Sequence, residues 1–350
     1  MVKVVILCGG DQQVSLFGEP YTVLEQTMLR SQHLYLSCSH LIVICNHQNH
    51  NNINKSLFQL NLKCPTTVIL EPYCRNTGPS IAGLIKYLEI ESLISDDDNC
   101  LVFPSDHVMS IDAFNMSIAL GHKLIESRIV TFGVYPTYPE VEYGYIIEGE
   151  NQVIERFIEK PNYDVAKQLI QNPKCYWNSG IYYFNLKVIA NEYRLLYPTF
   201  LEKLNFSRTG SCVIIDDQSY ALYPTISFDK LIMEKTKNGY VVPFRGLWSD
   251  IGSWKGIYQV SQPYRSLNYK GFEANGCHIF NYHAKQSIKV IGVDNLCVLN
   301  TKDTIIISPL QQVSAVKRFV QQSEKKSLQS TPYVEINVAI LLIILMSMSL

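Results

Sequence analysis

The chain has 350 residues, 47% hydrophobic and 17% charged, which is long enough for one large globular domain and a smaller second one. Its 30 basic residues are balanced by 31 acidic ones, which argues against the strongly basic surface of DNA- and RNA-binding proteins. No nucleic-acid partner is therefore expected.

The first predicted strand, Val4–Cys8, is a continuous apolar run that stops at Gly9 and Gly10. This pattern is typical of a buried parallel strand. In an α/β sheet, backbone N–H groups beyond the first strand can face phosphates. A Gly-Gly pair is also typical of an ordinary tight turn, so both interpretations stay open here.

Strands and helices then alternate through the first half of the chain, which predicts a Rossmann-like, mostly parallel sheet covered on both faces. In chain order the predicted elements are a helix over Thr22–Ser31, strands Leu41–Cys45 and Thr67–Leu70, a helix over Ile81–Ile94, strand Leu101–Phe103, a helix over Ala113–Ser127 and strand Ile129–Val134.

The pattern changes after Pro136, with two neighbouring strands, Tyr145–Ile147 and Val153–Ile158, followed by helix Asp164–Gln171, strand Ile181–Phe184 and helix Leu186–Leu196. Residues 263–266 indicate a boundary. Beyond it, short strands predict a small β domain closed by a helix: Cys277–Phe280, Ser287–Val293, Leu296–Asn300, Thr304–Ile307 and the helix Val313–Gln321. We accordingly divide the chain into domains 1–262 and 263–325 and a tail, 326–350.

Ten cysteines are present without a Cys-x-x-Cys pair, which favours buried thiols in a reducing compartment, the cytoplasm. The amino terminus has too few apolar residues for a signal peptide. The uncharged end, 336–350, is shorter than the roughly 20 residues of a membrane-spanning helix. A buried terminal element, a weakly membrane-associating tail or an end unrelated to the fold are each favoured over an anchor.

Three stretches of the chain carry candidate chemistry. Asp106 follows a buried strand, where a carboxylate is well placed to hold Mg²⁺ on nucleotide phosphates; the alternative is a turn-forming aspartate. Asp250 could be a second carboxylate on the same metal or the N-cap of a following helix. Lys160, after Glu159 at a strand end, could reach a phosphate, although this pattern alone would more often be a turn.

Eight stretches of the chain form a recognisable series of motifs: Leu70–Pro79, Pro104–His107, Thr131–Thr137, Tyr143–Ile146, Phe157–Pro161, Trp177–Gly180, Ser227–Lys235 and Trp248–Trp254. Together and in this order, they resemble the motifs of the sugar-phosphate nucleotidylyltransferases, specifically the mannose-1-phosphate guanylyltransferases. The similarity covers roughly residues 1–320.

The resemblance implies a Rossmann-like nucleotidyltransferase (GT-A-like) mixed sheet with a small C-terminal domain resembling a short left-handed β-helix, which in this family often supports a homodimer. It also implies that mannose 1-phosphate attacks the α-phosphorus of GTP, giving GDP-mannose and pyrophosphate. Asp106 and Asp250 would hold Mg²⁺, and Lys160 would clamp the sugar phosphate. The remaining implied site residues are Gly144, Glu159, Asn178, Asp229 and Glu234 for the sugar, and Gly9, Gly10, Glu71, Arg75, Asn76 and Thr77 for the nucleotide.

The loop after Gly10 departs from the family. Gln13-Val14 stand where a Thr-Arg pair is expected, and no lysine occurs between Lys3 and Lys55. In the family, the arginine and a lysine neutralise the triphosphate and the leaving pyrophosphate. Two hypotheses follow: an active guanylyltransferase, or a catalytically impaired relative that binds sugar phosphate or GDP-mannose as a sensor or partner subunit.

Overall fold

The computed structural model describes residues 2–9, 21–95, 97–210, 212–250, 269–281, 286–300 and 305–309. The chain divides into two compact units. The first unit comprises Met1–Gly9, Glu25–Ser105 and Met109–Trp248, and the second comprises Gly10–Leu24, Asp106–Val108 and Ser249–Leu350.

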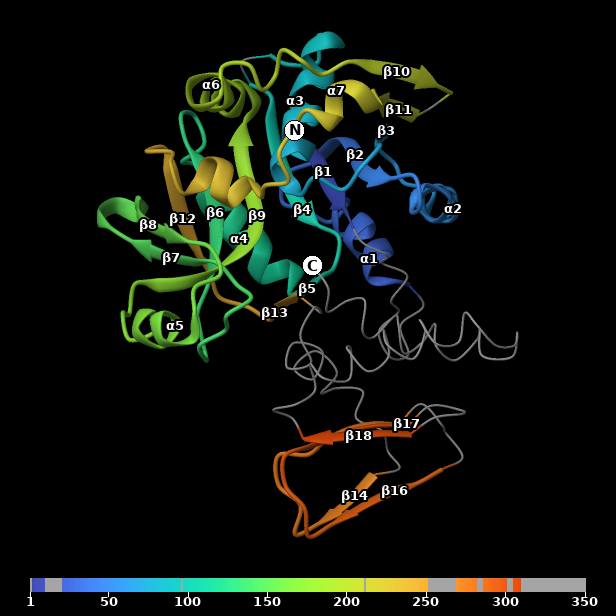
Figure 1. Ribbon diagram of the computed structural model, residues 1–350, viewed down its shortest axis with the longest axis vertical. Helices are drawn as coiled ribbons and strands as arrows, with labels where there is room; N and C mark the ends of the chain where they lie inside the picture. The colour runs from blue at the N-terminus through green and yellow to red at the C-terminus, as the bar shows by residue number, and fades with distance from the viewer. Residues whose placement is uncertain are drawn as a thin grey trace. The chain divides into compact units, whose positions relative to one another are not determined.

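Strands and helices alternate along the first part of the chain, as predicted (Figure 1). In chain order they are β1 (Val2–Cys8), α1 (Val23–Arg30), β2 (Cys38–Asn46), α2 (His50–Leu60), β3 (Thr66–Glu71), α3 (Thr77–Ile90), β4 (Asn99–Pro104), β5 (His107–Met109), α4 (Ile111–His122), β6 (Ile129–Val134), β7 (Tyr145–Glu148), η1 (Glu150–Gln152), β8 (Ile154–Ile158), α5 (Tyr163–Leu169), β9 (Cys175–Asn185), α6 (Leu186–Leu196), β10 (Phe206–Thr209), β11 (Cys212–Ile215), α7 (Asp217–Ala221), η2 (Asp229–Met233), β12 (Gly239–Phe244) and β13 (Trp248–Asp250).

Among the described residues, 11 strands form one mixed sheet in the order β10-β11-β3-β2-β1-β4-β9-β6-β12, with β7 paired to both β8 and β9. β1 runs parallel to β2 and β4, and β2 runs parallel to β3, as the alternating pattern predicts. β9 is antiparallel to the three strands with which it pairs, β4, β6 and β7. The mixed α/β fold is therefore confirmed, although the first half of the sequence alone suggests a mostly parallel sheet.

Helices cover both faces of this sheet (Figure 1). Ile85 of α3 belongs to one buried apolar cluster with Val102 of β4, and residues of α6 join the same cluster. Phe114 of α4 packs on Phe103 and Phe132, with ring centroids 5.5 and 4.9 Å apart. Because successive residues of a strand point to opposite faces, Val102 and Phe103 place α3 and α4 on different sides of β4.

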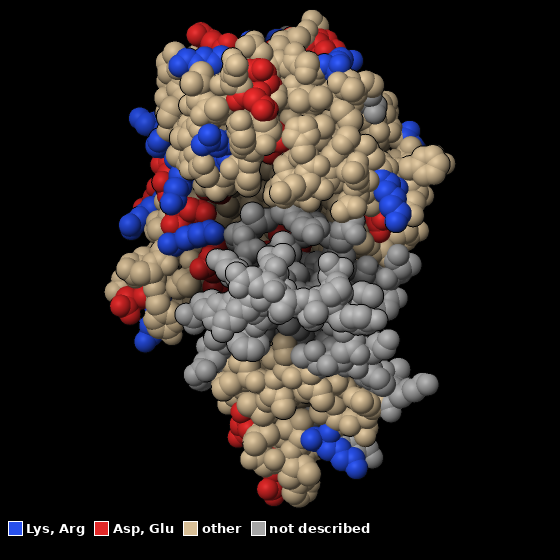
Figure 2. Space-filling model, turned by 45° about the vertical axis from the view of Figure 1, so that its right-hand side comes forward, with Lys and Arg blue, Asp and Glu red and all other residues tan. Residues whose placement is uncertain are grey.

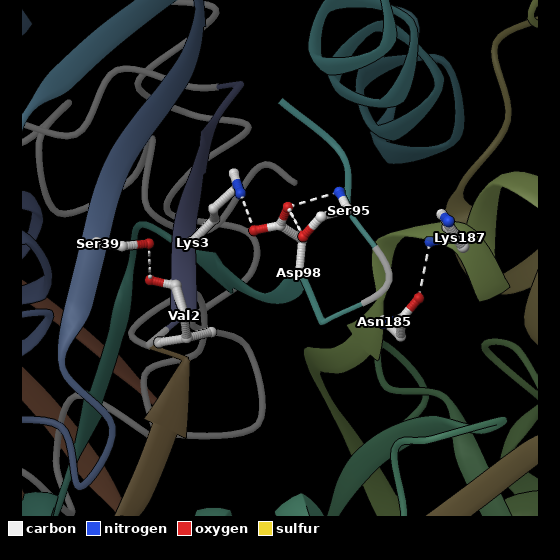
Figure 3. A network of polar contacts seen from close by, with 7 residues as sticks. All are labelled: Val2, Lys3, Ser39, Ser95, Asp98, Asn185 and Lys187. Atoms are coloured by element: carbon white, nitrogen blue, oxygen red, sulfur yellow. Dashed lines mark hydrogen bonds and ion pairs between the residues drawn. The ribbon is translucent and has the colours of Figure 1, made fainter. Parts of the chain in front are cut away.

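The amino-terminal ends of β1 and β4 are joined by an ion pair between Lys3 and Asp98 (Figure 3). The Lys3 side chain is only 9% exposed and that of Asp98 is 26% exposed. Asp98 also accepts hydrogen bonds from the backbone N–H and hydroxyl of Ser95, at 2.6 and 2.7 Å. Burial raises the pKa of Asp98, but the contacts with Lys3 and Ser95 outweigh it and hold the pKa below its usual value.

The second unit contains a small β region made of β14 (Tyr269–Phe272), β15 (His278–Asn281), β16 (Ile288–Ile291), β17 (Leu296–Asn300) and β18 (Ile305–Pro309). β14 pairs in parallel with β16, and β15 with β17. β17 is antiparallel to β18. The small C-terminal β region is therefore confirmed, and the parallel pairing of its alternate strands is typical of stacked coils. The predicted boundary after residue 262, the helix Val313–Gln321 and the tail 326–350 lie outside the described residues.

Charged side chains of both signs share the surface. On the face drawn in Figure 2, lysines and arginines are interspersed with aspartates and glutamates over the described residues. Within the described ranges, no helix has both the length and the apolar character that crossing a membrane requires.

Candidate functional site

Five residues that the family resemblance implies for the sugar lie together in the first unit. We call this group the sugar-side cluster, and its members are Gly144, Glu159, Asn178, Asp229 and Glu234. The Asn178 N–H donates to the Gly144 carbonyl at 2.8 Å, and the Asn178 amide donates to Asp229 at 2.7 Å. The Glu159 N–H donates to Glu234 at 3.3 Å. Residues beside β7 and β8, within β9 and at η2 therefore converge on one place.

Asn178 owes its position to a bulge in β9. Thr131 of β6 pairs with Tyr182, whereas Gly133 pairs with Asn178, so two steps along β6 correspond to four along β9. Gly180 lies inside this bulge with φ of +67°, a conformation that glycine adopts most readily. The bulge redirects the strand locally and presents the Asn178 amide to the cluster.

Hydrogen bonds fix the orientation of that amide. The Thr131 hydroxyl donates to Asn178 Oδ1 at 2.9 Å, which leaves the Asn178 Nδ2 group free to donate. Nδ2 lies 2.7 Å from Asp229 Oδ1 and 3.0 Å from the Tyr182 hydroxyl. The Tyr182 hydroxyl also donates to Asp229. Asp229 is therefore held by two donors from the same strand, and its carboxylate has a defined direction.

Two carboxyl groups of the sugar-side cluster, those of Glu159 and Asp229, have pKa values above their usual range. Burial, followed by the nearby charge of Asp229, raises the pKa of Glu159 to about 8. Burial also raises the pKa of Asp229. The raised pKa values favour a proton held within the cluster, which gives it a hydrogen-bond donor beside its acceptors. A pairing of donors and acceptors suits a polyhydroxylated ligand.

A side chain at Gly144 would displace the Glu159 carboxyl. A Cβ atom at this position would lie 2.7 Å from Glu159 Oε2. The preceding residue, Tyr143, packs edge-on between Trp177 and Trp248, with ring centroids 5.2 and 5.5 Å away. These aromatic contacts anchor the backbone of Gly144 beside the Glu159 carboxyl.

Lys160 follows Glu159 at the end of β8, beyond which the chain turns. Its backbone has φ of +46°, which is unusual for a residue with a side chain. The Lys160 side chain is 43% exposed, and its Nζ lies 3.7 Å from Glu142 Oε2 at the surface. A surface ion pair of this kind is weak, so the ammonium group can exchange Glu142 for a phosphate at little cost.

The nucleotide-side segment, which we define as Glu71–Thr77, joins β3 to α3. Glu71 is buried, and its Oε1 accepts hydrogen bonds from the hydroxyls of Ser80 and Tyr220. Burial raises the pKa of Glu71 to about 7, although both hydroxyls oppose the shift. The Glu71 side chain thus supports the segment from within the core.

The surface of the nucleotide-side segment is formed by other residues. Asn76 is exposed and its side chain caps α3 by accepting from the Thr77 N–H at 2.8 Å. Arg75 donates to the Ala221 carbonyl at 3.3 Å, and its guanidinium lies 5.7 Å from the centroid of the exposed Tyr73 ring. A planar cation, an aromatic ring and an amide are groups suited to contact a nucleotide base.

The two aspartates expected to bind metal belong to the second unit, and we call them the metal-side pair. Asp106 immediately precedes β5 and Asp250 is the last residue of β13, and these two short strands pair with each other. Burial raises the pKa of Asp106, whose Oδ1 lies 3.9 Å from His107 Nε2. A cation would offset the cost of burying this carboxylate, and Mg²⁺ commonly uses one or two carboxylates plus phosphate oxygens. The donor set therefore fits Mg²⁺.

Among the described residues, the metal-side pair is not accompanied by a third protein ligand. Across the described parts of the chain, no three His, Cys, Asp or Glu side chains are arranged to hold a metal ion.

Gly9 follows β1, and a Cβ there would meet no described atom within 4 Å. Gly10 and the loop up to Pro20 lie outside the described residues, so their expected role stays a prediction.

Four hydroxyl-bearing residues of the site are not predicted from the sequence: Thr131, Tyr182, Ser80 and Tyr220. One of them leaves a recognisable signal. Tyr182 lies four residues after Asn178, a spacing that normally puts both side chains on one face of a strand. Tyr220 leaves none, because it meets Glu71 across 149 residues of sequence.

Comparison with known proteins assigns this architecture. The nucleotidyl transferase family model matches residues 10–266. The mannose-1-phosphate guanylyltransferase of Salmonella muenchen is 32% identical over 296 residues, covering 80% of this chain and 62% of that protein. The enzyme of the same name from Escherichia coli is 31% identical over 327 residues, covering 86% of this chain and 66% of that protein. The chain thus spans less than two thirds of the length of these two relatives.

Among solved structures, a protein from Thermus thermophilus described as a mannose-1-phosphate geranyltransferase superposes with a TM-score of 0.72. The match covers 92% of this chain and 99% of that one, at 23% identity, and it bears on the fold alone. The family match, the relatives and the fold agree with the resemblance inferred from the motifs. The chain therefore belongs to the nucleotidyl transferase family, and the relatives from Salmonella muenchen and Escherichia coli that it resembles are mannose-1-phosphate guanylyltransferases.

Proposed function

We propose that the chain transfers a guanylyl group from GTP to mannose 1-phosphate. A phosphate oxygen of mannose 1-phosphate forms a bond to the α-phosphorus of GTP, the bond to the β-phosphate oxygen breaks, and pyrophosphate leaves. The observation that carries this proposal is the geometry of the sugar-side cluster, in which Asn178 and Tyr182 direct the Asp229 carboxylate and the Glu159 N–H donates to Glu234. The similarity to guanylyltransferases supports the choice of substrates.

Each part of the chain has a separate task in this reaction. The sugar-side cluster binds the mannose hydroxyls, and Lys160 neutralises the sugar phosphate. The surface of the nucleotide-side segment, including Arg75 and Asn76, binds the base. Asp106 and Asp250 would hold Mg²⁺, which supplies charge neutralisation on the phosphates when bound. Catalysis of this kind depends on positioning and charge, so no covalent nucleophile is required.

The test is release of pyrophosphate from GTP and mannose 1-phosphate in the presence of Mg²⁺. We expect turnover with this pair, and much slower turnover with ATP or UTP, or with glucose 1-phosphate. Equal rates with all nucleotides and sugars would contradict the assigned substrates. An absence of turnover with retained thermal stabilisation by GDP-mannose would instead favour the catalytically impaired relative, which the missing Arg and Lys of the loop after Gly10 motivate.

We further propose that the protein works in a reducing compartment, the cytoplasm. All ten cysteines are free thiols, and seven of them are buried. Buried free thiols are typical of proteins kept reduced. Fractionation of the source cells, followed by detection of the full-length chain, tests this assignment. Recovery outside the cytoplasmic fraction would contradict it.

A further inference from the structure

One residue of the nucleotide-side segment has a strained backbone. Asn76 has φ of +68° and ψ of 176°, a region that is essentially restricted to glycine. A residue with a side chain keeps such a conformation only where its surroundings enforce it. The contacts that hold Asn76 in this conformation therefore show which residues fix the nucleotide-side segment.

Backbone hydrogen bonds to Ile226 flank the strained residue on both sides. The Ile226 N–H donates to the Arg75 carbonyl at 3.1 Å, and the Gly78 N–H donates to the Ile226 carbonyl at 3.0 Å. A Cβ at Gly78 would lie 2.7 Å from the Ile226 carbonyl oxygen, so the close approach requires glycine. The backbone of Ile226 thus clamps Asn76 in place.

A third contact continues from this clamp to the sugar-side cluster. The Thr77 hydroxyl accepts a hydrogen bond from the Phe228 N–H at 2.8 Å. Phe228 is fully buried, with its ring 4.7 Å from that of Tyr182. The next residue is Asp229, whose carboxylate accepts from Asn178 and Tyr182. The Thr77 hydroxyl oxygen therefore links the nucleotide-side segment to Phe228, the residue immediately before Asp229.

We propose that Thr77 is a positioning residue that couples the two halves of the substrate site, because its hydroxyl fixes the Phe228 N–H and thereby the place of Asp229. Thr77 belongs to the nucleotide-side segment, yet its hydroxyl acts on sugar binding. The assignment of the two halves to the nucleotide and the sugar rests on the proposed function, whereas the hydrogen bond between Thr77 and Phe228 is independent of it.

The experiment compares Thr77→Val, which removes the acceptor at nearly constant shape, with Thr77→Ser, which keeps it. Thr77→Val is expected to raise KM for mannose 1-phosphate about tenfold, the effect of leaving one buried N–H without a partner. Thr77→Ser is expected to return this KM to within about threefold of the parent. Thr236→Val is the matched control, because the Thr236 hydroxyl also accepts a backbone N–H, from Asn238 at 3.0 Å, and Thr236 is not a member of the sugar-side cluster or the nucleotide-side segment.

A second readout is amide hydrogen exchange at Phe228 and Asp229, which we expect to accelerate in Thr77→Val and not in Thr77→Ser. Three results would overturn the coupling: a KM change for GTP alone, an equal effect of Thr236→Val on mannose 1-phosphate, or unchanged exchange at Phe228. If the parent chain neither turns over nor binds GTP or mannose 1-phosphate by calorimetry, the proposed function fails. The exchange measurement then decides alone whether Thr77 holds Phe228.

Discussion

Replacement of Glu71 by glutamine should make the free energy of unfolding less dependent on pH. Glu71 is 5% exposed, and its Oε1 accepts hydrogen bonds from Ser80 and Tyr220. Glutamine keeps an oxygen for these two donors and, like the protonated carboxyl, carries no charge. Burial raises the pKa of Cys45 nearby to about 12 and that of Tyr220 still higher, so both stay neutral between pH 5 and 8.

The size of the effect follows from the difference between the folded and unfolded pKa values. The pKa of Glu71 is about 7 in the folded chain and 4.5 for the ordinary carboxyl. Between these values the unfolded state loses its proton first, so rising pH favours unfolding. The parent should lose about 2.5 kcal/mol of stability from this group between pH 5 and pH 8. Below pH 4.5 the penalty disappears, because both states hold the proton.

Urea unfolding followed by circular dichroism at pH 5, 6, 7 and 8 measures this difference. The stability of Glu71→Gln relative to the parent should rise by about 2.5 kcal/mol across the series, with an unchanged dependence on urea. Glu202→Gln, the same substitution at an exposed position, is the control. A difference between Glu71→Gln and the parent that stays constant from pH 5 to pH 8 would refute the reasoning.

Three further outcomes are expected. Gly144→Ala should raise KM for mannose 1-phosphate about tenfold with little change in Tm, since its Cβ would displace the Glu159 carboxyl 2.7 Å away; Gly149→Ala is the control, and an unchanged KM would count against the cluster. Asp98→Asn should lower the free energy of unfolding by about 2 kcal/mol at pH 7, because it leaves the 9%-exposed Lys3 unpaired. That loss should shrink in acid, where the depressed pKa of Asp98 is reached, and urea unfolding at pH 3 and 7 checks it. Removal of Mg²⁺ by EDTA should abolish pyrophosphate release and Mg²⁺ should restore it; full activity in EDTA would exclude a metal role for the metal-side pair.

Much of the sheet can be predicted because its buried strands are continuous apolar runs. The strand Ile129–Val134 and the helix Leu186–Leu196 have the same bounds in the prediction and in the structure. Helix α2 is not predicted, because its first turns are rich in asparagine, a weak helix former, and only Ile53 and Ser56 are buried. The sequence also does not predict that β9 runs antiparallel to β4 and β6, since the apolar pattern of a strand is the same in both directions.

The motifs predict the positions of the candidate site residues but not their contacts. One motif predicts Asp229, whereas its partner Tyr182 lies 47 residues earlier and shows only the pattern of a buried strand. Glu71 is expected to belong to a segment that lies against the nucleotide, but its two hydrogen-bond partners inside the core could not be predicted. Such pairings depend on which elements meet in three dimensions, and that information is spread over the whole chain.

The bulge in β9 has a consequence for how this site can change during evolution. Regular pairing is present on both sides of the bulge, at Gly133 with Asn178 and at Thr131 with Tyr182. Substitutions or length changes within Ser179–Ile181 can therefore turn the Asn178 amide toward a different ligand while the flanking pairs keep the sheet intact. A new direction of the Asn178 amide can therefore come from changes in a short stretch of one strand, without a change in the pairing on either side of it.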